Sequence, residues 1–208
     1  MSLLTKSKYM QGQQCPRLLW LSVNNKLPEK SIGEKQKLEQ GHEFEEYAQA
    51  QMVWLDSILT NNPQKWTAIT LHYPFFSTKP SRDNPELRAR FRPIIEKHNV
   101  DIVLQGHDHA YGRGMAGIPS ALDSTVSTNT MYVVSVSGPK MYDLAERSWM
   151  TRRAANTQFF HVVTVKGDTL NFKAYTATRE LYDEFDLIKK SDGTKKLVDK
   201  KPDLPEKL

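Results

Sequence analysis

Cysteine is almost absent from this sequence, because the 208 residues include only Cys15. A single cysteine cannot form an intramolecular disulfide, so the chain is not a disulfide-stabilised scaffold. Long hydrophobic runs are also absent, and no stretch approaches the ~20 apolar residues that a membrane-spanning helix needs. No N-terminal segment has the charged-then-apolar pattern of a secretory signal peptide. For the chain as written we therefore expect a cytoplasmic location and no membrane partner.

A large charge of one sign is missing as well. The formal net charge is +5, and the excess of lysine is concentrated from Ile188 to the C-terminus. This segment has little apolar periodicity, so we expect a solvated or unstructured Lys-rich tail over 190–208 rather than a nucleic-acid or membrane patch. No basic stripe with interleaved aromatic side chains is present, so nucleic acid is not an expected partner. The 38% of hydrophobic residues can nevertheless supply a globular core.

Two regimes of composition meet near residue 50. The first, residues 1–50, is polar and rich in Lys, Gln and Glu, with Thr5 or Ser7 as a helix cap before a short apolar run. Residues 33–59 have the periodicity of a helix that continues across the boundary. We therefore expect a short helical N-terminal segment.

The second regime, residues 51–189, alternates strands and helices. Residues 66–71 form a short β-branched run, and residues 84–99 form an amphipathic pattern with a proline near its start. Residues 100–106 read as a second buried strand. This order predicts an α/β fold with a parallel βαβ unit and a right-handed crossover.

Further strands follow at 131–138, 158–177 and 181–189. Gly167-Asp168 separates two alternating runs and predicts a hairpin turn, although the usual Asp-Gly order is reversed. We expect these segments to extend the sheet of the βαβ unit by antiparallel strands.

Histidines follow both strands of the predicted βαβ unit. His72 comes directly after the first strand, and His107 and His109 follow the second in "GHDH". Loops at the carboxyl ends of parallel strands lie at one edge of a sheet, so these imidazoles are expected to converge. Neutral imidazole is a good ligand for Zn, Fe, Mn or Co, although a His-x-His sequence alone is weak evidence. His98 and His161 are expected to be structural and away from this site, and His42 to lie on a solvated helix face.

Three ordered blocks resemble the C-terminal half of calcineurin-like metallophosphoesterases, most closely the purple acid phosphatase-like branch. The blocks are "QMVWLDSILTNNPQKWTAITLHYPFF", "GHDHAYGRG" and "MYVVSVSGPKMYD". The resemblance covers residues 51–189 and implies a partial metallophosphoesterase sandwich. It also implies metal-dependent hydrolysis of phosphate esters, with a small molecule or a phosphoprotein as the substrate and a metal pair of Fe, Zn or Mn as the cofactor.

The resemblance also implies roles for individual residues. His72 and His107 correspond to ligands of the second metal and His109 to a ligand of the first. Asp108 is expected to have a role behind the ligands or in solvent, not to bind metal. Lys79 and Arg82 correspond to a loop that borders the substrate and are candidates to bind its phosphate, the alternative being a flexible exposed loop.

The chain lacks the other half of this ligand set. The family pattern places Asp-x-His, Gly-Asp-x-x-Asp and Gly-Asn-His upstream, and none of these occurs here. Without the bridging carboxylate two metal cations would face each other with no anion between them, so we expect at most one weakly bound metal and hydrolysis near background for the isolated chain. The catalytic residues stay unassigned, and an inactive chimeric or truncated remnant is the alternative.

The first 50 residues show a different resemblance. "LTKSKYMQGQQCPRLLWL" and "LEQGHEFEEYAQ" resemble the opening segment of RecB-like PD-(D/E)XK nucleases. The carboxylates and lysine that cut DNA in those enzymes come later in the chain and are missing here. An iron–sulfur cluster needs four cysteines, so Cys15 is expected to be an ordinary thiol. A nucleic-acid-associated module is therefore a distant alternative, and a partner chain that supplies the missing metal ligands is an open possibility.

Overall fold

The computed structural model describes residues 48–115 and 129–208. The chain divides into two compact units, Met1–Gln51 and Met52–Leu208, and the fold described is that of the second unit. The N-terminal segment that resembles a nuclease, including Cys15 and His42, lies outside the described residues except for the start of a helix over 48–60. No helix in the described ranges is long and apolar enough to cross a membrane.

The first sheet is mixed and has five strands. In spatial order they are β1 (Ala68–Leu71), β2 (Ile102–Gln105), β4 (Met131–Val134), β3 (Tyr111–Gly114) and β5 (Arg152–Ala154). β1 pairs with β2 and β2 with β4 in parallel, whereas β3 is antiparallel to both β4 and β5. The predicted parallel pair of strands before His72 and His107 is therefore confirmed.

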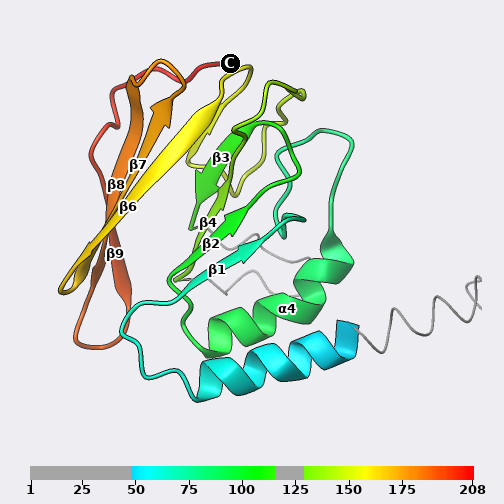
Figure 1. The fold of residues 1–208 in the computed structure, drawn as a ribbon, viewed down its shortest axis with the longest axis vertical. Coiled ribbons are helices and arrows are strands. Elements are labelled where there is room, and N and C mark those ends of the chain that lie inside the picture. The colour runs from blue at the N-terminus through cyan, green and yellow to red at the C-terminus, as the bar shows by residue number, and fades with distance from the viewer. Residues whose placement is uncertain (1–47, 116–128) are drawn as a thin grey trace, which may run out of the picture. The chain divides into compact units, whose positions relative to one another are not determined.

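Helix α4 (Pro85–Lys97) connects β1 to β2. It has Pro85 at its start, Glu86 in its first turn and Lys97 in its last, which matches the polarity of the helix dipole. Its buried Ile95 packs in a core cluster with Val103 and with other side chains of the sheet. The helix covers one face of the first sheet and completes the predicted βαβ unit (Figure 1).

The later strands form a second sheet of their own. It is antiparallel throughout, in the order β6 (Phe159–Lys166), β7 (Thr169–Thr176), β8 (Leu181–Lys189) and β9 (Lys195–Asp199). β6 and β7 form the predicted hairpin, with Gly167 in the left-handed region at φ 58°. The expectation that 158–177 and 181–189 extend the first sheet is wrong, because no strand of one sheet pairs with a strand of the other among the described residues. The segment 131–138 does join the first sheet through β4, but it pairs with β2 in parallel and not antiparallel.

Burial explains why the second sheet stands apart. Side chains of β7 alternate strictly between partly buried and buried, so that one face of the sheet is apolar. That face packs on the inner face of the first sheet, and a single cluster joins Ile102 and Met131 to Phe172 and Phe185. Two sheets that cover each other bury more apolar surface than one wide sheet exposed on one side.

The Lys-rich segment is more ordered than its composition suggested. Residues Lys195–Asp199 pair with β8 as the edge strand β9. The Lys195 side chain is buried, and its ammonium lies 3.1 Å from a carboxylate oxygen of the buried Asp101. Beyond β9, Ala155 donates its backbone N–H to the carbonyl of Lys207 at 2.6 Å. The expectation of an unstructured tail is therefore wrong for Lys195–Asp199, because a buried lysine is tolerated where a carboxylate pairs with it, whereas most residues from 202 to 208 are exposed.

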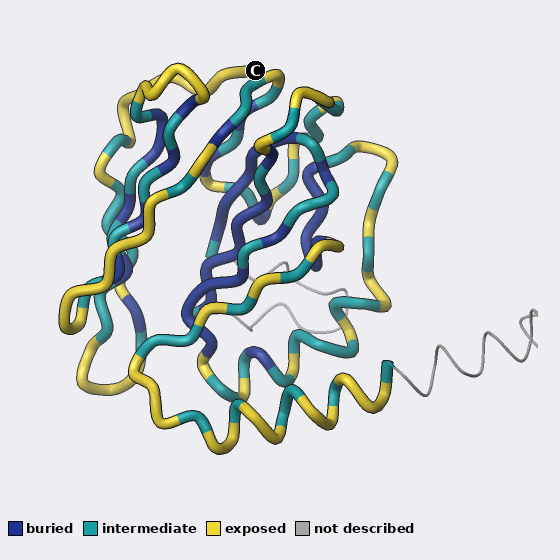
Figure 2. Tube along the Cα trace, viewed as in Figure 1, coloured by how far each residue is buried: buried dark blue, intermediate teal, exposed yellow. Residues whose placement is uncertain are grey.

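The edge strands β1 and β6 are more exposed to solvent than the strands at the centre of the first sheet. β2, β3 and β4 are buried along almost all of their length, whereas β1 and β6 carry exposed residues (Figure 2). On β6 the exposed side chains include four large apolar ones: Phe160, Val162, Val163 and Val165. The carboxyl end of β1 leads directly into His72.

Candidate functional site

Two of the expected histidines lie against each other. β1 ends at Leu71 and β2 at Gln105, so His72 and His107 emerge from neighbouring parallel strands. The Nδ1 atom of His107 lies 2.9 Å from Nε2 of His72, and their ring centroids are 4.8 Å apart. His107 has a left-handed backbone at φ 65°, which is unusual for a residue other than glycine. The structure thus brings these two imidazoles together.

His109 is held in a different direction. Its Nδ1 atom lies 2.7 Å from the backbone carbonyl of Lys140, and its ring stacks on Tyr142 with centroids 4.5 Å apart. The backbone N–H of Tyr142 donates to the carbonyl of His109 at 3.1 Å. His109 is therefore fixed against the loop that follows β4, with its Nδ1 atom toward the Lys140 carbonyl.

Asp108, between these histidines, is fully buried. Its carboxylate accepts hydrogen bonds from the Ser77 hydroxyl at 2.5 Å and from the backbone N–H groups of Thr78 and Lys79 at 2.9 and 3.3 Å. The guanidinium of Arg82 also donates to it. A solvent role for Asp108 is thus wrong. Its carboxylate ties the 77–82 loop to the histidine motif, as expected for a buried charge that must be paired.

The candidate phosphate-binding residues have different surroundings. Arg82 is engaged with Asp108, so its charge is already partly neutralised. The guanidinium of Arg147 donates to the carbonyls of Lys79, Pro80 and Arg82 at 2.9–3.2 Å. These bonds argue against a flexible loop. Lys79 places its ammonium 4.4 Å from the centroid of the Tyr142 ring.

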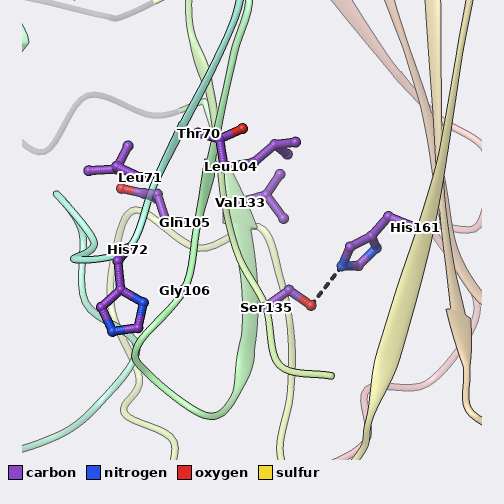
Figure 3. Close-up of a pocket in the computed structure, with 9 residues that line it drawn as sticks. All are labelled: Thr70, Leu71, His72, Leu104, Gln105, Gly106, Val133, Ser135 and His161. Atoms are coloured by element: carbon purple, nitrogen blue, oxygen red, sulfur yellow. Dashed lines mark hydrogen bonds between the residues drawn. The ribbon is translucent and has the colours of Figure 1, made fainter. Parts of the chain in front are cut away.

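A cavity of about 480 Å³ opens beside His72 (Figure 3). It is lined by residues of β1, β2 and β4, by residues that directly follow these strands and by His161 of β6: Thr70, Leu71, His72, Leu104, Gln105, Gly106, Val133, Ser135 and His161. Nε2 of His161 lies 2.7 Å from the Ser135 hydroxyl. The expectation that His161 lies away from the site is wrong, because it faces the same cavity as His72. His98 is bound to Asp56 at 2.6 Å, and no part of it lines this cavity.

Burial and neighbouring charge shift the pKa values of several groups. Burial lowers the pKa of His161 to about 4. Burial and the nearby Arg82 lower the pKa of His107, which favours the neutral imidazole that can bind a metal. A hydrogen bond from the Lys140 ammonium lowers the pKa of Tyr142.

The residues present do not fit a metal pair. Within the described ranges, no group of three or more His, Cys, Asp or Glu side chains is arranged to hold a metal ion. His72 and His107 offer two imidazoles to a single ion, but the carboxylate nearest in sequence, Asp108, is buried and engaged by four donors. A dinuclear centre needs an anionic bridge that these side chains do not supply.

Comparison with known proteins shows the fold alone. The sequence matches no family model and no curated protein. A purple acid phosphatase from yellow lupin is similar in structure, with a TM-score of 0.56 and 18% identity over 67% of this chain and 28% of that one. GAP50, described as the anchor in the inner membrane complex of Plasmodium, has a TM-score of 0.56 and 16% identity over 72% of this chain and 44% of that one.

The chain therefore spans less than half the length of each of these two structures. Nothing in these comparisons concerns the nuclease-like segment. The described part of this chain has a sheet with parallel strands, an antiparallel sheet and few helices. The described part of this chain has a mixed α/β fold similar to that of a purple acid phosphatase, a metallophosphoesterase.

Proposed function

We propose that this chain carries the histidine-bearing part of a metal-dependent phosphoesterase. The observation that supports this proposal best is the contact between His72 and His107 at the carboxyl ends of adjacent parallel strands, on a purple acid phosphatase-like fold. In this proposal the two imidazoles bind one metal ion, and His109 lies beside the substrate. The bound metal would polarise a phosphoryl oxygen and activate water.

The chain's own residues have narrower tasks in this proposal. His72 and His107 hold the ion as neutral ligands, and the lowered pKa of His107 keeps it deprotonated near neutral pH. Asp108 holds the 77–82 loop, and with it Lys79, next to the histidine motif. The remaining carboxylate ligands would come from elsewhere, because neither Asp-x-His nor Gly-Asp-x-x-Asp occurs in the sequence.

The test is the hydrolysis of an aryl phosphate at graded concentrations of Zn²⁺, Mn²⁺ or Fe²⁺. The purified chain should hydrolyse it at close to the uncatalysed rate. Addition of the upstream fragment of a purple acid phosphatase, which carries the missing carboxylates, should raise the rate in a metal-dependent way. His72→Ala and His107→Ala should abolish that increase. His98→Ala should retain it, because the His98 side chain contacts Asp56 and does not line the cavity beside His72. No increase at any metal concentration would count against the proposal.

A second candidate function is that of a non-enzymatic binding protein with the same fold. GAP50, which is described as an anchor, has a similar fold, and β6 of this chain is an edge strand with four exposed apolar side chains. Under this alternative the complementation assay stays at background. Replacement of Val163 and Val165 by lysine would then reduce association of the chain in sedimentation experiments, since exposed apolar edge strands promote association.

A further inference from the structure

Two lysines from separate loops converge on one tyrosine ring next to the histidine motif. The Lys79 ammonium lies 4.4 Å and the Lys140 ammonium 5.1 Å from the centroid of the Tyr142 ring. The His109 imidazole stacks on the same ring, with an interplanar angle of 24°. Cations near aromatic faces are a favourable arrangement, but here two of them share one ring. The result is a concentration of positive charge beside His109.

Neither ammonium is neutralised by a carboxylate. Within residues 48–115 and 129–208, the ion pairs of lysines involve Lys65, Lys97, Lys173, Lys189, Lys195, Lys200 and Lys207, but neither Lys79 nor Lys140. The nearest carboxylate of the motif, Asp108, is fully buried and occupied by Arg82. This patch therefore lacks the anion that would balance it.

The backbone of the patch is held by the histidine motif itself. The N–H of Lys79 donates to Asp108 at 3.3 Å and to the Ser77 hydroxyl at 3.1 Å. On the other side, the Lys140 carbonyl is bound to the His109 ring at 2.7 Å. The Tyr142 N–H is bound to the His109 carbonyl at 3.1 Å. The backbone groups of the two lysines are thus attached on either side of one motif.

We propose that Lys79, Lys140 and Tyr142 form an anion-binding subsite that takes the phosphate group of a phosphate monoester. Two ammoniums and a phenol supply donors to the phosphate oxygens, and charge-assisted hydrogen bonds of this kind are among the stronger ones. The subsite rests on the proposed function, because it sets the phosphate beside His109. It adds Lys140 and Tyr142 to the substrate-binding residues and removes Arg82, which is engaged with Asp108.

The experiment measures binding without metal, so that it is separate from hydrolysis. The full chain is kept in EDTA and titrated with inorganic phosphate or phenyl phosphate, with phenol as the ligand that lacks a phosphate. Ring signals of Tyr142 and His109 are followed by NMR. Both phosphates should shift these signals and phenol should not. A lower Kd for phenyl phosphate than for inorganic phosphate would show that the ester is preferred to the free ion.

Variants assign the binding to the two lysines. Lys79→Ala and Lys140→Ala should each raise the Kd by about tenfold, since a hydrogen bond to a charged group is worth about that factor. Lys166→Ala removes an equal charge from the exposed end of β6 and should leave the Kd unchanged. The double variant Lys79→Ala, Lys140→Ala combines both changes and should raise the Kd further. If it does not fold by circular dichroism, the Lys79→Gln, Lys140→Gln variant replaces it.

The outcomes separate this subsite from the proposed hydrolysis. A Kd that is unchanged in the double variant, or that rises equally in Lys166→Ala, would overturn the subsite. Phosphate binding that depends on both lysines, without any metal-dependent hydrolysis on complementation, would support the subsite and reject the phosphoesterase. Hydrolysis that needs His72 and His107 but is insensitive to both lysines would reject the subsite and keep the enzyme.

Discussion

Arg113 on β3 and Asp183 on β8 form a fully buried ion pair that joins the two sheets. The Nε and Nη2 atoms of Arg113 lie 2.8 and 2.9 Å from the two oxygens of Asp183. Tyr111 donates to the same carboxylate at 2.6 Å, and the Arg113 guanidinium also contacts Asp199 at 2.6 Å. Burial and the Asp183 charge raise the pKa of Tyr111 well above its usual value. This network links β3 of the first sheet to β8 and β9 of the second.

Loss of the Asp183 charge should strongly destabilise the fold. Asp183→Ala leaves a buried guanidinium without its main partner, and we expect a loss of about 3–5 kcal/mol in the free energy of unfolding. Urea unfolding monitored by circular dichroism measures this loss. Asp203→Asn, which changes an exposed carboxylate, should stay within about 0.5 kcal/mol of the parent. Equal effects of the two substitutions would show that the network does not stabilise the fold.

Removal of the Asp108 carboxylate should release the 77–82 loop. Asp108→Ala leaves the Ser77 hydroxyl, two backbone N–H groups and Arg82 without their acceptor, and we expect about 3 kcal/mol of destabilisation. Amide hydrogen exchange at Thr78 and Lys79 should accelerate in this variant. Ser77→Ala removes one donor only and should have the smaller effect. Unchanged exchange at both amides would contradict the anchoring role.

The stability of the fold should fall on acidification because of His161. Its pKa is about 4 in the folded state and 6.5 in the unfolded state, so the unfolded chain binds the proton more readily. The contribution of neutral His161 to the free energy of unfolding is about 3 kcal/mol. It is fully present above pH 6.5 and is lost as the pH falls toward 4. His161→Gln should flatten the pH dependence of the free energy of unfolding over this window. Parallel curves for the two proteins would exclude His161 as the source.

Gly114 should not tolerate a side chain. A Cβ atom at this position would lie 1.7 Å from the backbone oxygen of Trp149. The clash is severe because a backbone atom cannot move aside as the end of a flexible side chain can. We expect Gly114→Ala to destabilise the fold by about 3 kcal/mol or more. Gly138→Ala is the matched control, because nothing lies within 4 Å of its Cβ position. A melting temperature equal to that of the control would show that β3 can move away from Trp149.

Local sequence pattern determined the βαβ unit of this protein. The β-branched run before His72, the amphipathic helix that begins at Pro85 and the apolar run before His107 each read correctly from their periodicity. The proximity of His72 and His107 could be predicted from this unit, because adjacent parallel strands end at one edge of a sheet. The β6–β7 hairpin followed in the same way from alternation around Gly167.

Tertiary structure alone decided the features that depend on distant partners. The strand that contains Arg113 and the one that contains Lys195 carry charges which look solvated in sequence, yet they are buried against Asp183 and Asp101, 70 and 94 positions away. His109 turned toward the Lys140 carbonyl, and Asp108 toward the 77–82 loop. Periodicity reports which face of an element is apolar, but it carries no information about which buried charge will meet which partner. That choice is made by the packing of one sheet on the other.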